Sequence, residues 1–320
     1  MARTEKTRAT DTGAASRNKK QEGKMTISTI GFIGLGVMGE AMCRNLARKG
    51  TWKVIAFDQR QEPLERLKAD NVGIATSLRG LAQAADVILM CLPGGREVEI
   101  VTQGASGLVA LMRTGQTLVD MSTAPPALMS KLAADLAAKG ADFADAPIAR
   151  TRRAAVDGTL SIMVGGSPEI FARIKPVLET MGNEITHCGE VGAGQVVKIM
   201  NNMVVFETTM AVAEALSIAE ASGVDGKLLL ETMSKGSADS FVLRNHGMKH
   251  LLPQDYPEGA FSVRYAQKDL SYARELAKAA GIKARGADLV ATLFDEAIMA
   301  GDGERYTPVI RKVMKDEGEV

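Results

Sequence analysis

Short apolar runs alternate with amphipathic stretches through residues 29–188, and this alternation restricts the fold more than any other feature of the chain. It predicts repeated strand–helix–strand units and a largely parallel sheet. The expected strands are Thr29–Ile33, Val54–Asp58, Val87–Cys91, Thr117–Asp120, Asp142–Ala146, Leu160–Val164 and Glu184–Cys188. The expected helices between them include Met38–Lys49, Gln61–Asp70 and Ala127–Lys139.

The pattern changes near Gly192, and only helices are expected after it. Residues 195–222 form one long predicted helix, which Gly223 is placed to end. Apolar residues cover almost every side of its first half, which predicts a buried helix between two domains or between subunits. Further expected helices are Lys227–Ser234, Ser262–Ala280, Ala287–Ala300 and a last one capped by Thr307, with Pro308 in its first turn. The predicted domains are therefore residues 25–190 and 191–320.

Residues 1–24 differ from the rest, with seven basic against three acidic residues in a chain whose net charge is +1. They hold no large apolar side chain after Met1, so we expect a disordered basic tail. The tail lacks the apolar run of a signal peptide. It is either an extension ahead of Met25 or a nucleic-acid-binding arm. The first is favoured because isolated basic tails are usually solvated.

The composition excludes several classes of protein. A hydrophobic fraction of 46% and a charged fraction of 24% are globular values, and the small net charge gives no strong attraction to nucleic acid or membranes. No run approaches about 18 uninterrupted apolar residues, so no membrane span is expected. Cys43, Cys91 and Cys188 are few and far apart, which favours a reducing, cytoplasmic location over a disulfide framework. His246 and His250 lack partners for a metal site, and no metal is expected.

A glycine-rich turn follows the first expected strand. Gly34, Gly36 and Gly39 form a GxGxxG motif between an apolar run and a helical pattern. The three positions would allow a tight turn, a close approach of pyrophosphate to the backbone, and packing of helix on strand. The backbone N–H groups at the start of that helix would face the phosphates, so Leu35, Val37 and Met38 join the predicted cofactor site.

The second strand ends at Asp58, 19 residues after Gly39. An acidic residue there can accept hydrogen bonds from the adenosine ribose hydroxyls. Its charge would repel a 2′-phosphate, which favours NAD over NADP as the cofactor, although Arg60 could offset part of this repulsion. Leu92 and Pro93 follow another predicted strand and should border the cofactor at the carboxyl edge of the sheet.

Four separated segments resemble the β-hydroxyacid dehydrogenases, the family of 3-hydroxyisobutyrate dehydrogenase and tartronate semialdehyde reductase. They read GFIGLGVMGEAMCRNL, DMSTAPP, DAPIARTRRAAVDGTL and GAGQVVKIMNN, and a weaker QKDL follows. The resemblance covers nearly everything from Met25 onward. It implies a Rossmann-type dinucleotide-binding domain joined by a long helix to an all-α C-terminal domain.

The resemblance places the family's catalytic lysine at Lys198. A lysine whose pKa is lowered by burial can donate and accept the proton that carbonyl reduction and alcohol oxidation require. Asn201 and Asn202 lie three and four residues later on the same predicted helix face, where they could hold the substrate. The resemblance also implies that Ser122 and Thr123 line the junction of substrate and nicotinamide. It places Lys268 close to the cofactor.

The third segment departs from the common family pattern of Ser-Gly-Gly. The chain has Ala149-Arg150-Thr151 there, which is similar to the Gly-Arg-Thr of the bacterial sulfolactaldehyde reductases. That likeness implies that Arg150 binds a sulfonate, for which a guanidinium offers a fork of donors, and that Thr151 adds a hydroxyl. Arg152 and Arg153 follow and are not part of that likeness.

These features predict an NAD-dependent oxidoreductase that acts on a small anionic substrate, a sulfonate or a carboxylate. Reduction of 3-sulfolactaldehyde is the first choice. The alternatives are 4-hydroxybutyrate, 3-hydroxyisobutyrate or tartronate semialdehyde as substrate and, in another class, an inactive cofactor-binding nucleic-acid module. No nucleic-acid or membrane partner is expected, and the apolar connecting helix favours a homo-oligomer, a dimer or a tetramer.

Overall fold

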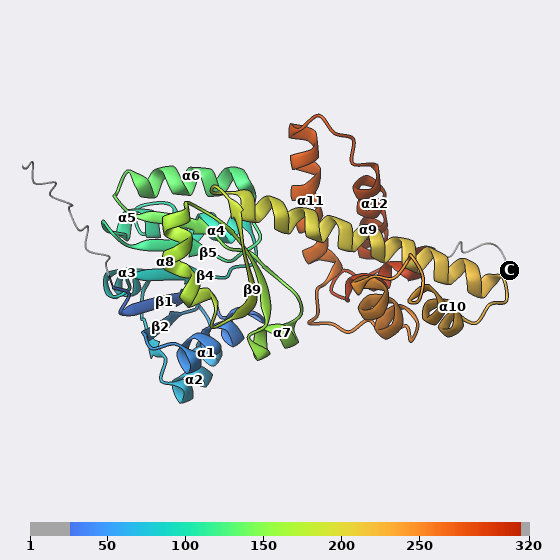
Figure 1. Ribbon diagram of the computed structural model, residues 1–320, viewed down its shortest axis with the longest axis horizontal. Coiled ribbons are helices and arrows are strands. Elements are labelled where there is room, and N and C mark those ends of the chain that lie inside the picture. The colour runs from blue at the N-terminus through green and yellow to red at the C-terminus, as the bar shows by residue number, and fades with distance from the viewer. Residues whose placement is uncertain (1–25, 315–320) are drawn as a thin grey trace, which may run out of the picture.

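The structure is a computed structural model that describes residues 26–314. The predictions for residues 1–24 and for Met25 lie outside the described residues. Figure 1 shows an α/β part and a helical part joined by one long helix, α9 (Ala193–Ala221). The predicted fold class is therefore confirmed.

The α/β part is built on a nine-stranded sheet in the order β3-β2-β1-β4-β5-β6-β8-β7, with β9 also paired to β8. The pairings from β1 to β6 and that of β8 with β9 are parallel, whereas β8 is antiparallel to β6 and β7. The strands are β1 (Thr29–Ile33), β2 (Lys53–Phe57), β3 (Gly73–Ile74), β4 (Val87–Met90), β5 (Thr117–Asp120), β6 (Asp142–Asp145), β7 (Ile148–Ala149), β8 (Leu160–Gly165) and β9 (Gly182–Gly189). All seven predicted strands are present, each within two residues of its expected ends.

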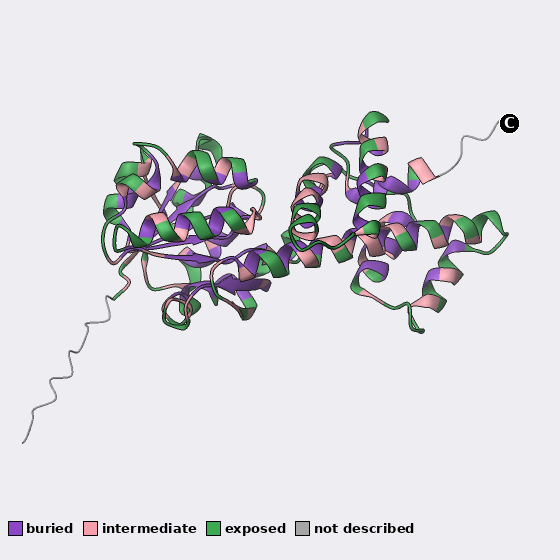
Figure 2. Ribbon diagram, turned by 90° about the horizontal axis from the view of Figure 1, so that it is seen from above, coloured by how far each residue is buried: buried purple, intermediate pink, exposed green. Residues whose placement is uncertain are grey.

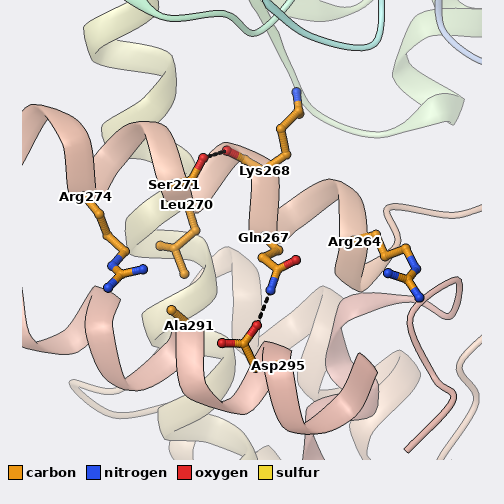
Figure 3. A pocket seen from close by; sticks show the side chains of 8 residues that line it. All are labelled: Arg264, Gln267, Lys268, Leu270, Ser271, Arg274, Ala291 and Asp295. Atoms are coloured by element: carbon orange, nitrogen blue, oxygen red, sulfur yellow. Dashed lines mark hydrogen bonds between the residues drawn. The ribbon is translucent and has the colours of Figure 1, made fainter. Parts of the chain in front are cut away.

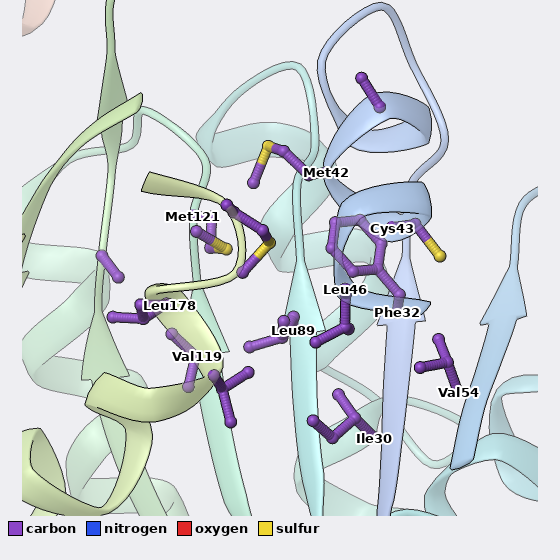
Figure 4. Packing of buried hydrophobic residues seen from close by; sticks show 14 of the residues in the cluster. Ile30, Phe32, Met42, Cys43, Leu46, Val54, Leu89, Val119, Met121 and Leu178 are labelled. Atoms are coloured by element: carbon purple, nitrogen blue, oxygen red, sulfur yellow. The ribbon is translucent and has the colours of Figure 1, made fainter. Parts of the chain in front are cut away.

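Helices cover both faces of this sheet. One apolar cluster packs α1, α2, α7 and α8 against it, and a second packs α3 to α6 against the other face. Figure 4 shows part of the first cluster, where Met42 and Leu46 of α1 lie near Phe32 of β1. The helices are α1 (Gly39–Lys49), α2 (Gln61–Leu67), α3 (Leu78–Ala84), α4 (Gly95–Thr102), α5 (Leu108–Leu111), α6 (Pro126–Ala137), α7 (Arg152–Asp157) and α8 (Pro168–Leu178).

The helical part packs around the second half of α9, where Phe206, Val212 and Leu216 are buried in a third apolar cluster. Its elements are α10 (Gly226–Met233), a π-helix (Leu243–Leu251), α11 (Val263–Ala279), α12 (Arg285–Met299) and a 3-10 helix (Thr307–Met314). The π-helix was not predicted. The expected cap of the last helix is wrong, because Thr307 lies within the 3-10 helix and its buried hydroxyl has no hydrogen-bond partner in the structure.

The prediction that α9 is buried on every side in its first half is wrong for the single chain. Ile199 is fully buried, but Val197 is 43% and Val204 55% exposed. Figure 2 shows buried and exposed residues alternating along this helix. By length and composition alone α9 could cross a membrane, which is weak evidence because the core helix of a soluble protein passes the same test. In the structure α9 packs against β8, β9 and α11, and its second half also packs against the other helices of the helical part.

Candidate active site

The glycine-rich turn lies at the carboxyl end of β1, where the chain order of the sheet reverses between β1 and β4. Gly34 has a φ of +89°, and a side chain there would collide with the carbonyl oxygen of Cys91. A side chain on Gly39 would collide with the carbonyl oxygen of Gly34. Around Gly36, by contrast, a Cβ would meet nothing within 4 Å. The turn therefore leaves open space at the position where a dinucleotide pyrophosphate approaches the backbone.

The start of α1 completes this turn. Val37 is exposed, Met38 is half-buried, and the Met38 position has no side-chain cap for the helix. Free N–H groups at a helix start suit a phosphate. Leu35 differs from this pattern, because its N–H donates to Asp58 Oδ2 at 2.6 Å. That amide is engaged within the chain.

Asp58 follows β2 and joins the turn to the next loop. Its Oδ1 accepts from the backbone N–H of Arg60 at 2.8 Å, and Arg60 also donates to the carbonyl of Leu35 at 2.9 Å. Burial opposes ionisation of this carboxyl, but the hydrogen bonds from Arg60 and Leu35 outweigh it and hold the pKa of Asp58 below its usual value. Asp58 is thus a fixed negative charge beside the glycine-rich turn.

Two loops at the carboxyl edge of the sheet meet at Ser122. The hydroxyl of Ser122 accepts from the backbone N–H of Leu92 at 2.9 Å, which ties the loop after β5 to the loop after β4. Lys268 of α11 reaches both loops, since its Nζ donates to the carbonyl of Pro93 at 2.7 Å and lies 3.5 Å from that of Thr123. The structure therefore brings together five residues that were predicted from separate segments. Neither Ser122 nor Thr123 caps α6.

Two tyrosines that were not predicted as site residues lie close to Lys268. Its Nζ lies 4.4 Å from the ring centre of Tyr265 and 5.3 Å from that of Tyr272. The hydroxyl of Tyr272 accepts from the backbone N–H of Gly95 at 3.2 Å. These contacts hold α11 against the loop after β4.

Lys198 lies at the start of a chain of buried polar groups. Its Nζ donates to Asn202 Oδ1 at 2.9 Å, and Asn202 Nδ2 donates to Asp269 Oδ2 at 2.7 Å. Burial lowers the pKa of Lys198 to about 8, although the negative charge of Asp269 acts in the opposite direction. A lysine with this pKa can both give and take a proton near neutral pH.

Asp269 connects the two lysines of the site. Its Oδ1 lies 2.8 Å from Lys268 Nζ, an ion-pair distance whose geometry is not that of a hydrogen bond. Asp269 was not predicted as a site residue, although it follows Lys268 directly. Asn201 is exposed, and its Nδ2 lies 3.2 Å from Asn202 Oδ1.

Arg150 has a backbone and side-chain geometry that the sequence did not indicate. Its φ is +86°, a left-handed conformation that favours glycine. Its Nη1 donates to the carbonyl of Thr159 at 2.5 Å and to Asn183 Oδ1 at 2.7 Å. The described partners of this guanidinium are thus near the amino end of β8 and not in the Lys198 chain. Thr151 is the cap of α7, and its hydroxyl accepts from Ala154 N–H at 3.4 Å.

A surface pocket of about 360 Å³ opens between α11 and α12. Figure 3 shows Gln267 bonded to Asp295 across it, whereas the ammonium of Lys268 points away from these two residues. Only Lys268 belongs to both this pocket and the predicted site. The described residues contain no group of three histidine, cysteine or acidic side chains placed to hold a metal.

Comparison with known proteins agrees with this arrangement. Residues 29–189 match the family model of the NAD-binding domain of 6-phosphogluconate dehydrogenase, and residues 192–312 match the NAD-binding model of NADP-dependent 3-hydroxyisobutyrate dehydrogenase. The 2-(hydroxymethyl)glutarate dehydrogenase of Eubacterium barkeri is 33% identical over 89% of this chain and 94% of its own. The 3-hydroxyisobutyrate dehydrogenase of Pseudomonas aeruginosa is 37% identical over 81% of this chain and 87% of its own.

Solved structures that resemble this chain also include a 3-hydroxyisobutyrate dehydrogenase. The Mycobacterium tuberculosis 3-hydroxyisobutyrate dehydrogenase, solved with L-serine, has a TM-score of 0.82 and 27% identity, over 91% of this chain and all of that one. Fold and site together define a nicotinamide-dependent dehydrogenase of two domains. The chain belongs to the 3-hydroxyisobutyrate dehydrogenase-like family of β-hydroxyacid dehydrogenases. The open cradle at Gly36 and the carboxylate of Asp58 fit such a dinucleotide.

Proposed function

We propose that this enzyme interconverts a short anionic aldehyde and its alcohol with NAD(H), and that 3-sulfolactaldehyde is its first candidate substrate. The observation that carries the proposed chemistry is the Lys198–Asn202–Asp269 chain, which holds a buried amine of lowered pKa at a fixed place. This chain starts on α9, whose first turn also contacts the loop of Ser122.

In this proposal Lys198 Nζ carries the proton of the reaction. A nicotinamide dinucleotide held by the Gly36 cradle and Asp58 would supply a hydride to the carbonyl carbon or accept one from the alcohol. The ammonium of Lys198 gives a proton to the carbonyl oxygen during reduction, and the neutral amine takes it back during oxidation. Among the residues that the structure describes, Asn202 accepts one hydrogen bond from Nζ, which leaves the other two N–H bonds of an ammonium for substrate.

The sulfonate candidate rests on Arg150. The chain keeps an arginine at a left-handed position where glycine would be less strained. A guanidinium fork together with the Thr151 hydroxyl offers donors to the three oxygens of a sulfonate. In the structure Nη1 of Arg150 donates to Thr159 and Asn183, so the contact would use Nη2 and Nε unless these two bonds are released.

A carboxylate is the second candidate, and the engaged guanidinium of Arg150 favours it. The names of the relatives also favour it, since they include 2-(hydroxymethyl)glutarate, L-serine, 3-hydroxyisobutyrate and 2-hydroxy-3-oxopropionate as substrates. Under this alternative the enzyme acts on 3-hydroxyisobutyrate, 4-hydroxybutyrate or tartronate semialdehyde.

A substrate panel separates the two candidates. We would measure kcat/KM for 3-sulfolactaldehyde, succinic semialdehyde and tartronate semialdehyde with NADH and NADPH, and for 3-hydroxyisobutyrate with NAD and NADP. If the sulfonate candidate is correct, kcat/KM for sulfolactaldehyde should exceed kcat/KM for each carboxylate by about tenfold or more, a difference near 1.4 kcal/mol in transition-state binding. If kcat/KM for a carboxylate exceeds that for sulfolactaldehyde by the same factor, that carboxylate becomes the first candidate substrate. Absence of turnover with all of them contradicts the proposal.

The same proposal includes assembly into a homo-oligomer. Val196, Val197 and Val204 are 38%, 43% and 55% exposed on one side of α9, close in sequence to Lys198. Exposed apolar side chains on a helix that carries the site support burial by a second subunit. Light scattering coupled to size-exclusion chromatography tests this, and a monomer mass at micromolar concentration would contradict it.

A further inference from the structure

A buried glutamine links α9 to the loop that follows β5. Gln195 lies in the first turn of α9 and has no exposed surface. Its Nε2 donates to the carbonyl of Ser122 at 2.7 Å, and its Oε1 accepts from the N–H of Ala124 at 3.1 Å. One side chain therefore holds the backbone on both sides of Thr123.

The start of α9 is itself fixed to the sheet. Asp145, at the end of β6, accepts from the N–H of Gly192 at 2.6 Å and from that of Gln195 at 2.8 Å. The backbone at Gly194 packs so closely that a Cβ there would collide with the carbonyl oxygen of Met163. Rotation or translation of this helical turn is therefore opposed by both hydrogen bonds and close packing.

We infer that Gln195 is a positioning residue, which sets the distance between Lys198 and the Ser122–Ala124 loop. Lys198 lies three residues after Gln195, about one helical turn, on the same side of α9. The loop presents the Ser122 hydroxyl to Leu92 and the Thr123 carbonyl to Lys268. Gln195 thus joins the element that carries the proposed proton donor to the element that borders the cofactor.

Loss of the two hydrogen bonds would leave the turn of α9 in place, because Asp145 bonds to backbone atoms and not to the glutamine side chain. The Ser122–Ala124 loop would be freed from α9. Misplacement of reacting groups by about 1 Å can lower turnover by about 100-fold. The expected defect is therefore in turnover more than in cofactor affinity.

The chain offers a matched control at the opposite edge of the sheet. Gln116, just before β5, is also fully buried. Its Nε2 donates to the carbonyls of Ala82 and Ala85 at 2.6 Å each, and its Oε1 accepts from Arg113 N–H at 2.7 Å. Gln116→Met and Gln195→Met each remove the hydrogen bonds of one buried glutamine while keeping its approximate volume, but only the second lies beside the site.

The experiment compares these two variants with the wild-type protein. We would measure melting temperature, NADH affinity by fluorescence, kcat and KM on the aldehyde that the wild type reduces fastest, and crystal structures with NADH. Both variants should lose stability to a similar degree. Gln195→Met should lower kcat by about tenfold or more with KM and NADH affinity within about threefold, and its Ser122–Ala124 loop should move away from α9. Gln116→Met should keep kcat within about twofold.

Equal kcat values in the two variants, or a fall in NADH affinity as large as the fall in kcat, would overturn the inference. The crystal structures give a result that does not depend on turnover. If the wild type reduces no aldehyde of the panel, the proposed function fails, and the inference is judged on the loop alone. A loop that stays in place in Gln195→Met would then overturn it.

Discussion

The ammonium of Lys198 donates to Asn202 Oδ1 at 2.9 Å, one helical turn further along α9. The other end of this amide donates to Asp269 Oδ2 at 2.7 Å. A lysine ammonium can only donate and an ionised carboxylate can only accept, so the two neighbours fix which way the Asn202 amide faces. The negative charge of Asp269 is thereby connected to the position of Lys198 through a single side chain.

The pH dependence of the reaction should follow Lys198, because burial lowers its pKa to about 8. Reduction needs the protonated amine, so log kcat for reduction should be level below pH 8 and fall above it. Oxidation needs the neutral amine and should rise through the same range. Asp269→Asn removes a charge that raises this pKa, so both inflections should move to lower pH. Profiles that keep the same inflection in Asp269→Asn would contradict the assignment.

Cofactor choice should depend on the charge of Asp58. We expect wild-type kcat/KM to favour NADH over NADPH by more than about tenfold, because a 2′-phosphate would meet this carboxylate. Asp58→Asn removes the negative charge but keeps the size of the side chain and an acceptor for the Leu35 N–H. Because Arg60 remains, the preference for NADH over NADPH should become smaller. Glu40→Gln on α1, whose carboxylate pairs with Arg44 and Arg66, is the control for a change in net charge. Equal use of both cofactors by the wild type would refute this prediction.

Arg150→Gly tests the sulfonate contact. Glycine removes the backbone strain of the left-handed conformation, which stabilises the variant, but the variant also loses the hydrogen bonds to Thr159 and Asn183. Because these two effects oppose each other, the melting temperature should change little. If Arg150 binds the acid group, KM for sulfolactaldehyde should rise by more than about tenfold. Arg153→Ala removes a neighbouring exposed arginine and should leave KM unchanged. An unchanged KM in Arg150→Gly would remove the sulfonate candidate.

Acid stability should depend on His246, whose ring is bonded to Thr209 and Tyr306. Burial, and next the charge of His250, lower its pKa to about 4, from 6.5 in the unfolded chain. Below pH 6.5 His246 therefore binds a proton in the unfolded chain, whereas in the folded protein it stays neutral until the pH approaches about 4. The free energy of unfolding falls by up to about 3 kcal/mol by pH 4.

Two buried carboxyls act in the opposite direction, because burial raises the pKa of Asp120 and of Asp145 to about 6. As the pH falls from about 6, these carboxyls bind protons in the folded protein before they do so in the unfolded chain, and this raises the free energy of unfolding. The contribution of His246 is therefore read from the difference between wild type and His246→Gln. In chemical denaturation at pH 7 and pH 5, the variant should lose less free energy of unfolding than the wild type. Equal losses would show that His246 is protonated in the folded state.

Most of the fold could be predicted because hydrophobic periodicity and glycine positions are local signals. The predicted strand Thr117–Asp120 has the same ends as β5, and the 195–222 helix is shifted by two residues or fewer from α9. The two-residue strands β3 and β7 and the π-helix were missed because such short or irregular elements have no clear period.

The site was harder to predict wherever it depends on long-range packing. Lys198 and the glycines stand in recognisable segments, but Asp269 reaches Asn202 across 67 residues only because α11 packs on α9. Gln195 lies in the GAGQVVKIMNN segment, but nothing in the sequence indicates that its side-chain amide forms hydrogen bonds with the loop after β5. The engaged side chain and left-handed backbone of Arg150 are tertiary features of the same kind.

The turnover of Lys198→Met tests the central claim most directly. Methionine keeps an apolar chain of similar length and removes the amine, while Lys131→Met, which changes an exposed lysine on α6, serves as the control. We predict that kcat for the best aldehyde falls by about 100-fold or more in Lys198→Met, with NADH affinity retained, because a general acid is lost. A Lys198→Met enzyme that turns over at the wild-type rate would show that Lys198 does not carry the proton.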